Sequence, residues 1–473
     1  MKNTDRISAL GMAAVLLLPS LCEAAEARKP FAPVADAVKQ RTGRDVRWDE
    51  DAAAAAESLR NVRGLLKKPL TSASAAQIAL LNNRELKATF EDVGISAADL
   101  REAGLLKNPA FDLTLRFPDR PPLATDAEEA VAFDFLHLLM MPLRKRVAAQ
   151  HLQAVQLRVA HEALKLVADA KSALYMLQAD AQLIDGLKVM QKTNAAALDL
   201  SQKQHEAGNI SDLALLQQQS AYSRARLEIA MADADMREHR EKLNRLLGLW
   251  GADTDWKIAG KLPPMPESDP PLKGLESLAV SQRLDLTAAQ SDLGGIVHAL
   301  GLTKSYRLIG ALEFGIDTEH NPDHSNVTGP TLRLEVPVFN QGQARIAKAQ
   351  AELRQAEWRF EGLAIEIRSE VRELDDRLRS KREIARFYHD ELLPGSVAIV
   401  KQTQLFFNGM LMGTYELFAA KSEEVRAERG YIEALRGYWM ARAELERAVG
   451  GSLAARQASR SESNLKETKP HHR

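Results

Sequence analysis

The sequence predicts a mainly α-helical protein with a small β part, built from two copies of one unit: a strand hairpin followed by a long α-helical coiled-coil hairpin. Three observations predict this fold class. The two halves show the same order of parts, each half has two runs of alternating apolar and polar residues, and each half continues into an unusually long helical pattern. Aromatic residues are only 5% of the chain, which is typical of extended helices that pack through small side chains.

Composition and spacing divide the chain into six segments. A Pro-rich stretch at 262–272 (LPPMPESDPPL) separates the two halves, and a polar, charged run closes the chain. The expected boundaries are an export signal (1–25), a weakly structured N-terminal lead-in (26–70), a first repeat (71–250), a Pro-rich linker (251–274), a second repeat (275–451) and a disordered tail (452–473).

The first segment has the order of parts of a bacterial export signal. Lys2 and Arg6 precede an apolar stretch at 7–21, and small residues follow at Ala24 and Ala25. The apolar stretch is shorter than the roughly 20 residues that a membrane-spanning helix needs. We therefore expect export and cleavage rather than a buried N-terminal helix.

Cys22, the only cysteine, lies where this signal would end, so no disulfide can form within one chain. Lipidation of Cys22 is one prediction, because bacterial lipoproteins carry acyl chains on the first mature residue. Leu21 and Pro19 depart from the lipoprotein pattern, however. Ordinary cleavage near Ala24 or Ala25 is the favoured alternative.

Each repeat contains two runs of alternating residues, the pattern of a strand with one apolar and one polar face. In the first repeat they cover 111–117 and 131–135, and Pro142 is expected to end the second run. In the second repeat they cover 308–316 and 332–338, separated by the loop DTEHNPDHSNVTG. Each repeat should supply one hairpin of about ten-residue strands with a long polar loop.

Each hairpin leads into a long helix. Apolar residues over 346–378 recur at steps of three and four, with a mean near the coiled-coil period of about 3.5, and 152–177 repeats this less cleanly. Some sixty residues would extend about 90 Å, which is too long for a compact core. Pro394 and Gly395 predict a local kink in the second copy. Shorter helices are expected at 51–66, 74–106 and 275–304.

Short turns end the long helices, and 208–216 aligns with 409–417. Glycine suits such a turn because a tight connection between helices often needs a positive φ, although this role would be purely structural. Two roles are open for Asp212. It contributes to a ring of carboxylates in an assembly, which would favour cations, or it is a helix N-cap. The candidate site residues are Gly208, Asp212, Gly409 and Gly413.

Four strands with one apolar face cannot close on themselves, because membrane barrels begin at about eight strands. Backbone polar groups inside a bilayer must all be paired, so an open four-stranded sheet is not viable there. Oligomerisation resolves this: a trimer would form a 12-stranded β-barrel continued by an α-helical barrel. A soluble β-rich domain is the alternative, and its strands would still need burial against something.

The chain after residue 70 resembles the TolC-like outer-membrane efflux proteins. The residues that carry the resemblance are Leu70-Thr71, the segments 78–86 (IALLNNREL) and 103–109 (AGLLKNP), the segment 336–342 (VPVFNQG), and the two turns. Their order and duplicated spacing make the match specific. Leu284 departs from the pattern, since many members have Pro before the Asp at this place.

The resemblance implies a homotrimeric, passive conduit that spans the outer membrane, contacts its lipid and extends into the periplasm. In that family an inner-membrane pump and a periplasmic adaptor supply substrate and energy. The resemblance implies that the turn end is the periplasmic gate, where the pore is constricted and the adaptor binds, and that its residues are Gly208, Asp212, Gly409 and Gly413. The stretch 82–109 looks most similar to outer-membrane components of heavy-metal cation efflux systems. No enzymatic activity or cofactor is implied.

Other functions find little support in the sequence. The net charge of -1, from 63 basic and 64 acidic residues, argues against nucleic-acid binding. No Gly-rich phosphate loop, Cys–His ligand set or nucleophile–base pair stands out. His320, Asp323 and His324 share one polar loop, where such residues commonly occur without a metal. A periplasmic adaptor and a soluble coiled-coil scaffold remain the alternatives, but neither accounts for a hairpin duplicated with strands.

Overall fold

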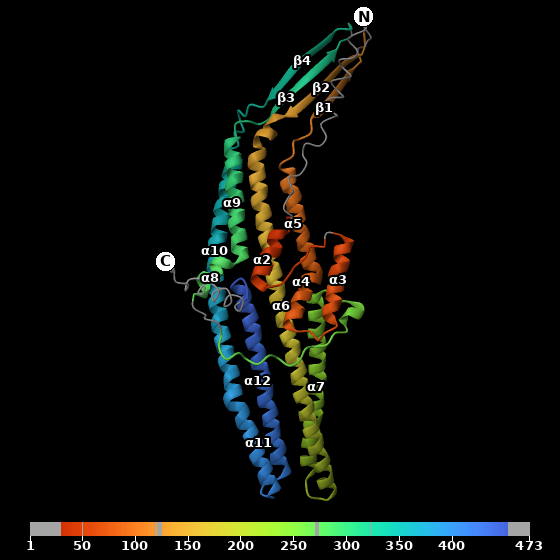
Figure 1. Ribbon diagram of the computed structural model, residues 1–473, viewed down its shortest axis with the longest axis vertical. Coiled ribbons are helices and arrows are strands. Elements are labelled where there is room, and N and C mark those ends of the chain that lie inside the picture. Colours follow the sequence, from red (N-terminus) through yellow and green to blue (C-terminus); the bar gives the residue numbers. More distant parts are fainter. Residues whose placement is uncertain are drawn as a thin grey trace, which may run out of the picture.

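The protein folds into a long rod with its strands at one end and the turns of two helical hairpins at the other (Figure 1). The predicted export signal, Cys22 and nearly all of the predicted tail lie outside the residues that this computed structural model describes. The described residues are 30–49, 51–117, 119–120, 125–269, 274–321 and 323–452.

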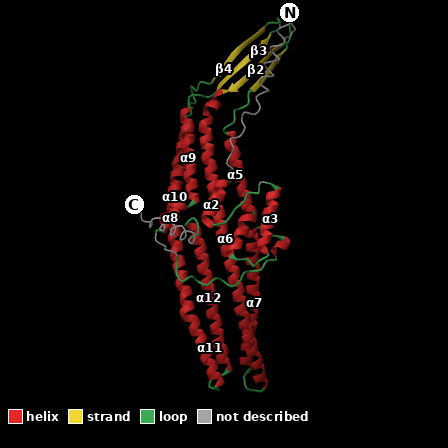
Figure 2. Ribbon diagram, in the orientation of Figure 1, coloured by secondary structure: helices red, strands yellow, loops and turns green. Residues whose placement is uncertain are grey.

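The two strand pairs join in one antiparallel sheet in the order β1-β2-β3-β4 (Figure 2). Val131 of the second strand pairs with Phe111 on one side and with Ile316 on the other, so the repeats meet between β2 and β3. The outer strands, β1 and β4, are the free edges. The strands are β1 (Ala110–Arg116), β2 (Asp126–Asp134), β3 (Leu312–His320) and β4 (Asn326–Leu334).

The second strand pair runs further toward its turn than the alternation predicts. Much of the predicted loop is paired as strand, so the connection between β3 and β4 covers only 321–325. A hydrogen bond from the Asn321 amide to the Ser325 carbonyl, at 2.9 Å, closes it. Polar side chains pair across this part, with Thr318 Oγ1 3.1 Å from Thr328 Oγ1. In the single chain Pro330 lies on an edge strand, where a missing N–H group is tolerated.

Two long hairpins form the shaft of the rod. The prediction that Pro142 ends a strand run is wrong: helix begins already at Phe135, where the Asp134 side chain caps the His137 amide at 3.0 Å, and Pro142 lies inside the helix. The long helices are α6 (Phe135–Glu206), α7 (Asp212–Leu247), α10 (Gln343–Phe387), α11 (Leu393–Asn408) and α12 (Thr414–Ala448). Among the described residues, none of the helices combines the length and apolarity needed to cross a membrane.

The helical segment that opens each repeat is two helices rather than one. The chain becomes extended at Asn83 (ψ 124°) and at Arg283 (ψ 126°), which are equivalent positions in the two repeats. Asn83 then caps the following helix by accepting from the Leu86 amide at 2.8 Å. The four helices are α4 (Ser72–Asn82), α5 (Arg84–Glu102), α8 (Leu275–Gln282) and α9 (Leu284–Ser305).

The lead-in is more ordered than its composition predicts. The expected helix is present as α3 (Ala52–Leu66), but α2 (Ala32–Thr42) precedes it. Val34 is fully buried, and the Phe31 ring meets the Phe90 ring edge-on at 4.8 Å. The prediction of weak structure is therefore wrong for the described part of 26–70, because this segment covers the middle of α6.

The hydrophobic core lies in the middle third of the rod, where α2, α4, α5, α7, α9 and α12 pack on α6 (Figure 1). The Pro-rich linker crosses the hairpins at this level after a short 3-10 helix (Gly251–Thr254). Gln178 Nε2 donates to the Ala259 carbonyl at 2.7 Å, and Trp439 Nε1 donates to the Pro263 carbonyl at 2.8 Å. The linker therefore ties the first hairpin to the second.

Candidate functional site

One face of the sheet is apolar and open to the surroundings. Residues that pair directly across strands share a face, so Phe111, Val131, Ile316 and Pro330 form one row of it. Most of its large side chains are exposed in the single chain. Its exposed apolar residues within the strands are Phe111, Leu113, Leu115, Phe133, Phe314, Ile316, Leu332 and Leu334.

The opposite face is strongly acidic. It carries seven carboxylates and two arginines: Asp112, Asp126, Glu128, Asp134, Glu313, Asp317, Glu319, Arg116 and Arg333. Arg116 pairs with Asp126 at 3.3 Å and with Glu128 at 2.9 Å, while Arg333 pairs with Glu313 at 3.4 Å. The acids outnumber the arginines, so a net negative charge remains on this face. A closed surface with this face inside would attract cations.

At the other end of the rod, the two turns share one backbone geometry. The Asn209 amide donates to the Gln204 carbonyl, and Gly208 adopts φ 75°. In the second turn the Leu411 amide donates to the Phe406 carbonyl, and Met410 adopts φ 56°. Both are Schellman turns with a left-handed residue after the helix.

The turns therefore align one residue away from the sequence alignment. Gly208 corresponds to Met410, and the prediction that Gly409 supplies a positive φ is wrong, since its φ is -82°. Gly413 is the N-cap of α12 and corresponds to Ser211. The glycine signal missed Met410 because a side chain in the left-handed region is unusual.

Asp212 lies in the first turn of α7 and is not its N-cap, because Ser211 takes that role by accepting from the Ala214 amide at 3.3 Å. His205, at the end of α6, places Nε2 2.6 Å from Asp212 Oδ1. The side chain of Asp212 is still 88% exposed. The carboxylate is thus held at the end of the rod by a histidine that sequence reasoning missed.

The second turn is apolar where the first is polar. Met410 is 94% exposed, and Leu411 and Met412 beside it are also exposed. Close to this turn, Tyr415 of α12 reaches the first hairpin: its hydroxyl lies 2.8 Å from Ser201 Oγ and donates to Gln204 Oε1 at 2.8 Å. A direct tie therefore joins the two hairpins near their free ends.

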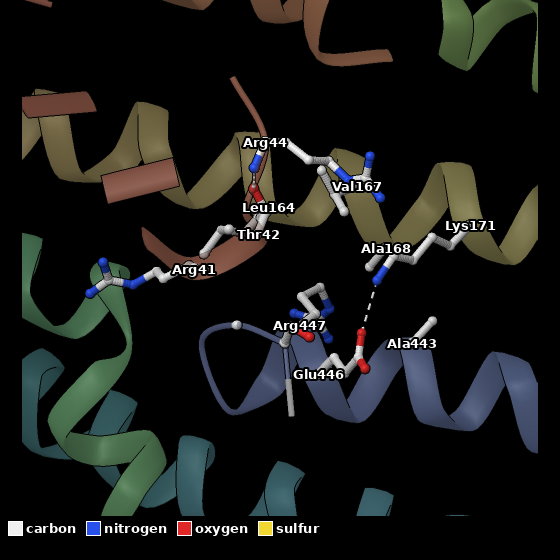
Figure 3. Close-up of a pocket in the computed structure, with 12 residues that line it drawn as sticks. Arg41, Thr42, Arg44, Leu164, Val167, Ala168, Lys171, Ala443, Glu446 and Arg447 are labelled. Carbon is white, nitrogen blue, oxygen red and sulfur yellow. Dashed lines mark hydrogen bonds and ion pairs between the residues drawn. The ribbon is translucent and has the colours of Figure 1, made fainter. Parts of the chain in front are cut away.

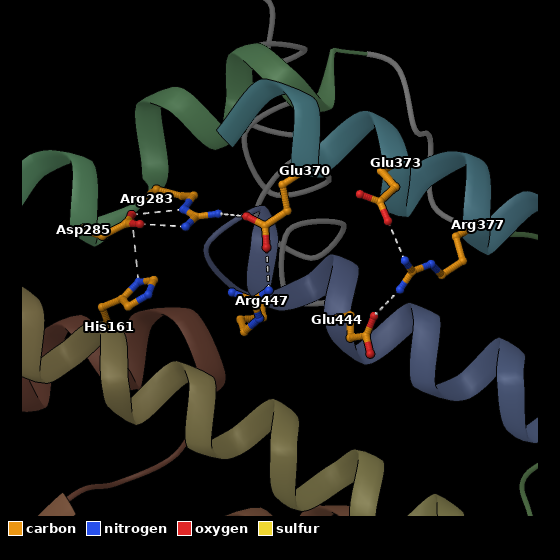
Figure 4. Close-up of polar contacts among 8 residues, drawn as sticks. All are labelled: His161, Arg283, Asp285, Glu370, Glu373, Arg377, Glu444 and Arg447. Atoms are coloured by element: carbon orange, nitrogen blue, oxygen red, sulfur yellow. Dashed lines mark hydrogen bonds and ion pairs between the residues drawn. The ribbon is translucent and has the colours of Figure 1, made fainter. Parts of the chain in front are cut away.

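In the middle of the rod, a buried ionic network joins the repeats (Figure 4). Arg283, at the break between α8 and α9, pairs with Asp285 at 2.6 Å and with Glu370 of α10. Glu370 also accepts from Arg447 of α12 at 2.5 Å, and His161 of α6 lies 3.9 Å from Asp285. Four helices are thus held at one level.

Burial sets the proton affinities in this network. Burial lowers the pKa of His161, and the nearby Asp285 carboxylate only partly opposes it. Burial alone would raise the pKa of Asp285, but the Arg283 guanidinium together with neighbouring groups outweighs it and holds that pKa below its usual range. The same balance, with Arg283 and Arg447, lowers the pKa of Glu370. The network is built from charged carboxylates and a neutral histidine.

A neighbouring pocket between α2, α6 and α12 is rich in cations (Figure 3). Lys171 pairs with Glu446 at 2.9 Å, and Arg447 with Glu370. Arg41 and Arg44 donate instead to main-chain carbonyls. These cations hold helix ends together, and no nucleophile–base pair lines this pocket.

Side-chain hydrogen bonds within the polar loop of the second strand pair hold its turn. His320 Nδ1 lies 2.7 Å from Asn326 Oδ1, and Asp323 Oδ1 accepts from Ser325 Oγ at 2.6 Å. Over the residues that the structure describes, no group of three or more His, Cys, Asp or Glu side chains could hold a metal ion.

No family model matches the chain, and no curated protein matches it in sequence. Solved structures do match. The CmeC outer membrane channel of Campylobacter jejuni has a TM-score of 0.70 at 14% identity, over 83% of this chain and 89% of that one. The open MtrE outer membrane channel of Neisseria gonorrhoeae has 0.66 at 14%, over 81% and 89%. The outer membrane protein VceC of Vibrio cholerae has 0.62 at 12%, over 84% and 97%.

These likenesses show the fold: the chain has the architecture of a protomer of such channels. The predicted fold class, a duplicated strand pair with long helical hairpins, is confirmed.

Proposed function

We propose that this protein is the outer-membrane channel subunit of a tripartite efflux system, a passive conduit that works as a homotrimer and is not an enzyme. An inner-membrane pump and a periplasmic adaptor would deliver substrate to it. The observation that carries the proposal is the sheet at the end of the rod, which has two free edges, one apolar face and one acidic face.

The free edges require partners. An edge strand presents unpaired N–H and C=O groups, and a bilayer offers them no water. Pairing β4 of one copy with β1 of the next in a closed ring of three would join twelve strands, a number within the range of membrane barrels. The apolar face would then meet lipid and the acidic face would line the lumen.

The shaft also has open sides that a second copy would cover. Trp358 of α10 is 72% exposed and Ile95 of α5 is 60% exposed. Trp358 precedes Glu370 by a dozen residues, and Ile95 follows Asn83 by the same number, so each lies about 18 Å above the breaks that mark the middle of the rod. Large exposed apolar side chains on the shaft favour side-by-side packing of copies.

Cations are the cargo class that these charges favour. The acidic face of the sheet would line one end of the lumen, and Asp212 lies at the other end, where three copies would form a ring. The resemblance of 82–109 to components of heavy-metal efflux systems supports metal cations within this class. Growth of a deletion strain on a panel of metal cations and drugs would identify the cargo.

Conductance of the purified protein in planar bilayers tests the channel function. We expect discrete openings, and Asp212→Ala should raise the conductance or weaken block by divalent cations. Asp199→Ala is a matched control, because Asp199 is also an exposed carboxylate on the same hairpin, paired with Lys203 at 2.7 Å. A protein that fractionates as a soluble periplasmic monomer, with no conductance, would contradict the proposal and favour an adaptor or scaffold.

A further inference from the structure

The pocket between α2, α6 and α12 carries more positive charge than its own carboxylate balances. Its charged lining residues are four cations and one carboxylate: Arg41, Arg44, Lys171, Arg447 and Glu446. Glu446 pairs with Lys171 at 2.9 Å. The carboxylate that pairs with Arg447 is Glu370, and it is shared with Arg283. Among the residues that line the pocket, nothing is left to balance the charges of the two arginines near α2.

These two arginines, Arg41 and Arg44, are partly buried and bonded to main-chain carbonyls instead. Arg41 donates to the carbonyls of Ala37 and Gln282, both at 3.4 Å, and its Nε is buried without a hydrogen-bond partner. Arg44 donates to the carbonyl of Ala73. Burial lowers the pKa of both guanidinium groups, and no nearby carboxylate opposes it. Since a guanidinium has five N–H donors and usually pairs with a carboxylate or a phosphate when buried, these arginines have donors to spare.

The cations reach the pocket from three parts of the chain that are far apart in sequence (Figure 3). Gly43 ends α2 with φ 66°, so the chain turns between Arg41 and Arg44. Lys171 comes from α6. Beyond the end of α12, the Ser452 amide donates to the Arg41 carbonyl at 3.0 Å, which joins the end of the second repeat to the lead-in. The backbone therefore fixes the positions from which the cations enter the pocket.

We propose that this pocket binds a tetrahedral oxyanion of the phosphate class, held by Arg44, Lys171 and Arg447. Such an ion has acceptor oxygens in four directions, which suits donors that arrive from three segments, whereas a flat carboxylate suits a single guanidinium fork. The pocket volume of about 130 Å³ admits an ion of this size with water around it. The bound ion links the lead-in to both hairpins, and Arg41 adds positive potential beside it.

The distance of the pocket from the sheet favours dissolved phosphate over a phosphate group on a lipid. Glu370, which bonds the pocket residue Arg447, lies in α10, and that helix begins near the sheet at Gln343. The helix between these two residues is about 40 Å long. If the sheet is the membrane end, a lipid headgroup cannot reach the pocket. Only this choice of source rests on the proposed function, because binding itself needs neither conduction nor assembly.

Titration calorimetry of the full chain in detergent, with inorganic phosphate at an ionic strength held constant with sodium chloride, tests the site. We expect one phosphate per chain. Arg44→Gln should weaken binding about tenfold or more, because a hydrogen bond to a charged group is worth at least that factor. Arg44→Lys keeps the charge and should bind with intermediate affinity. The matched control is Arg60→Gln, an exposed arginine of α3 in the same lead-in, which should bind as the unaltered protein does.

Hydrogen exchange gives an independent readout, since phosphate should slow exchange at 41–44 in the unaltered protein and not in Arg44→Gln. Absence of phosphate binding, or equal affinity in Arg44→Gln and the unaltered protein, would overturn the site. Equal competition by chloride would overturn the preference for a tetrahedral ion, whereas competition by sulfate would support it. Displacement of phosphate by vesicles of phosphatidic acid would overturn the dissolved source. Conductance is measured separately, so failure of this site leaves the channel proposal intact.

Discussion

The two long hairpins have one architecture but different local chemistry. In the first hairpin α6 is a continuous helix from the sheet to the turn. This turn is polar, with Gly208 in the left-handed conformation. The second hairpin is interrupted by a π-helical turn (Tyr388–Leu392) between α10 and α11, and its turn is apolar, with Met410 in the left-handed conformation. The comparison teaches that a duplicated backbone can place a π-helical turn and an apolar end in only one copy.

The π-helical turn has an identifiable cause. Proline has no amide hydrogen, and its ring clashes with the carbonyl four residues earlier in a regular α-helix. Just before Pro394, the Leu393 amide donates to the Tyr388 carbonyl five residues back, which widens the turn and accommodates the ring. At the place where a kink is predicted, near Pro394 and Gly395, the helix has a π-helical turn that ends two residues before the proline.

The largest loss of stability is expected from a substitution at Gly430 in the second hairpin. It lies on α12 directly opposite Tyr388, and a Cβ there would collide with the tyrosine ring. Gly430→Ala should therefore destabilise the second hairpin by about 2 kcal/mol, as overpacking typically does. Chemical denaturation in detergent measures this.

The matched control is Gly362→Ala in α10, where the added Cβ meets open space and better helix propensity should stabilise by about 0.5–1 kcal/mol. Adding Tyr388→Ala to Gly430→Ala should relieve the clash at 430. If Gly430→Ala and Gly362→Ala had the same effect, the close contact at Tyr388 would be wrong.

The two turns should respond in opposite directions. Gly208→Ala places a Cβ in the left-handed region and should cost about 1 kcal/mol, whereas Met410→Gly removes that strain and should gain a similar amount. Unfolding of both variants under the same conditions measures the pair. A loss of stability in Met410→Gly would mean that the Met410 side chain contributes packing that the single chain does not show.

The tie between the hairpins near their ends should have an effect of similar size. Tyr415→Phe removes the hydroxyl that reaches Ser201 and Gln204, while Ser201 keeps its own bond to the Ala197 carbonyl. The expected cost is about 1 kcal/mol, the usual net value of a hydrogen bond. Hydrogen exchange of α11 and the start of α12 should speed up, and unchanged exchange there would argue against this tie.

The network in the middle of the rod predicts the smallest effect, a pH dependence. Because burial lowers the pKa of His161, the unfolded chain binds a proton at a pH where the folded chain does not. Stability from this neutral histidine is complete above the unfolded pKa of about 6.5 and is lost as the pH falls from there toward the folded pKa. His161→Gln should flatten the slope of stability below about pH 6.5. An unaltered slope would mean that groups other than His161 cause the pH dependence of stability.

Most of the fold was predictable from periodicity, because long helices and alternating strands leave strong patterns. The strand limits of the second pair were not, since Thr318 and His320 lie in a part of β3 (317–320) that is polar on both faces and so shows no alternation. The breaks at Asn83 and Arg283 depend on contacts far along the chain: Asn83 Nδ2 donates to the Leu246 carbonyl, and Arg283 pairs with Glu370.

At the candidate site, sequence reasoning found the right turns but not their register. Gly409 lies one residue before the left-handed position, and only the hydrogen bonds of the turn identify Met410. The partner of Asp212 was missed because His205 lies across the turn from it. The predicted role of Cys22 falls outside the described residues, so the choice between lipidation and ordinary cleavage stays a prediction.

Native mass spectrometry of the protein extracted from outer membranes in detergent tests the central claim most directly. The free edges of β1 and β4 predict a complex of three copies with no smaller stable species. A monomer in that extract, or a protein recovered only from the soluble periplasmic fraction, would contradict the account.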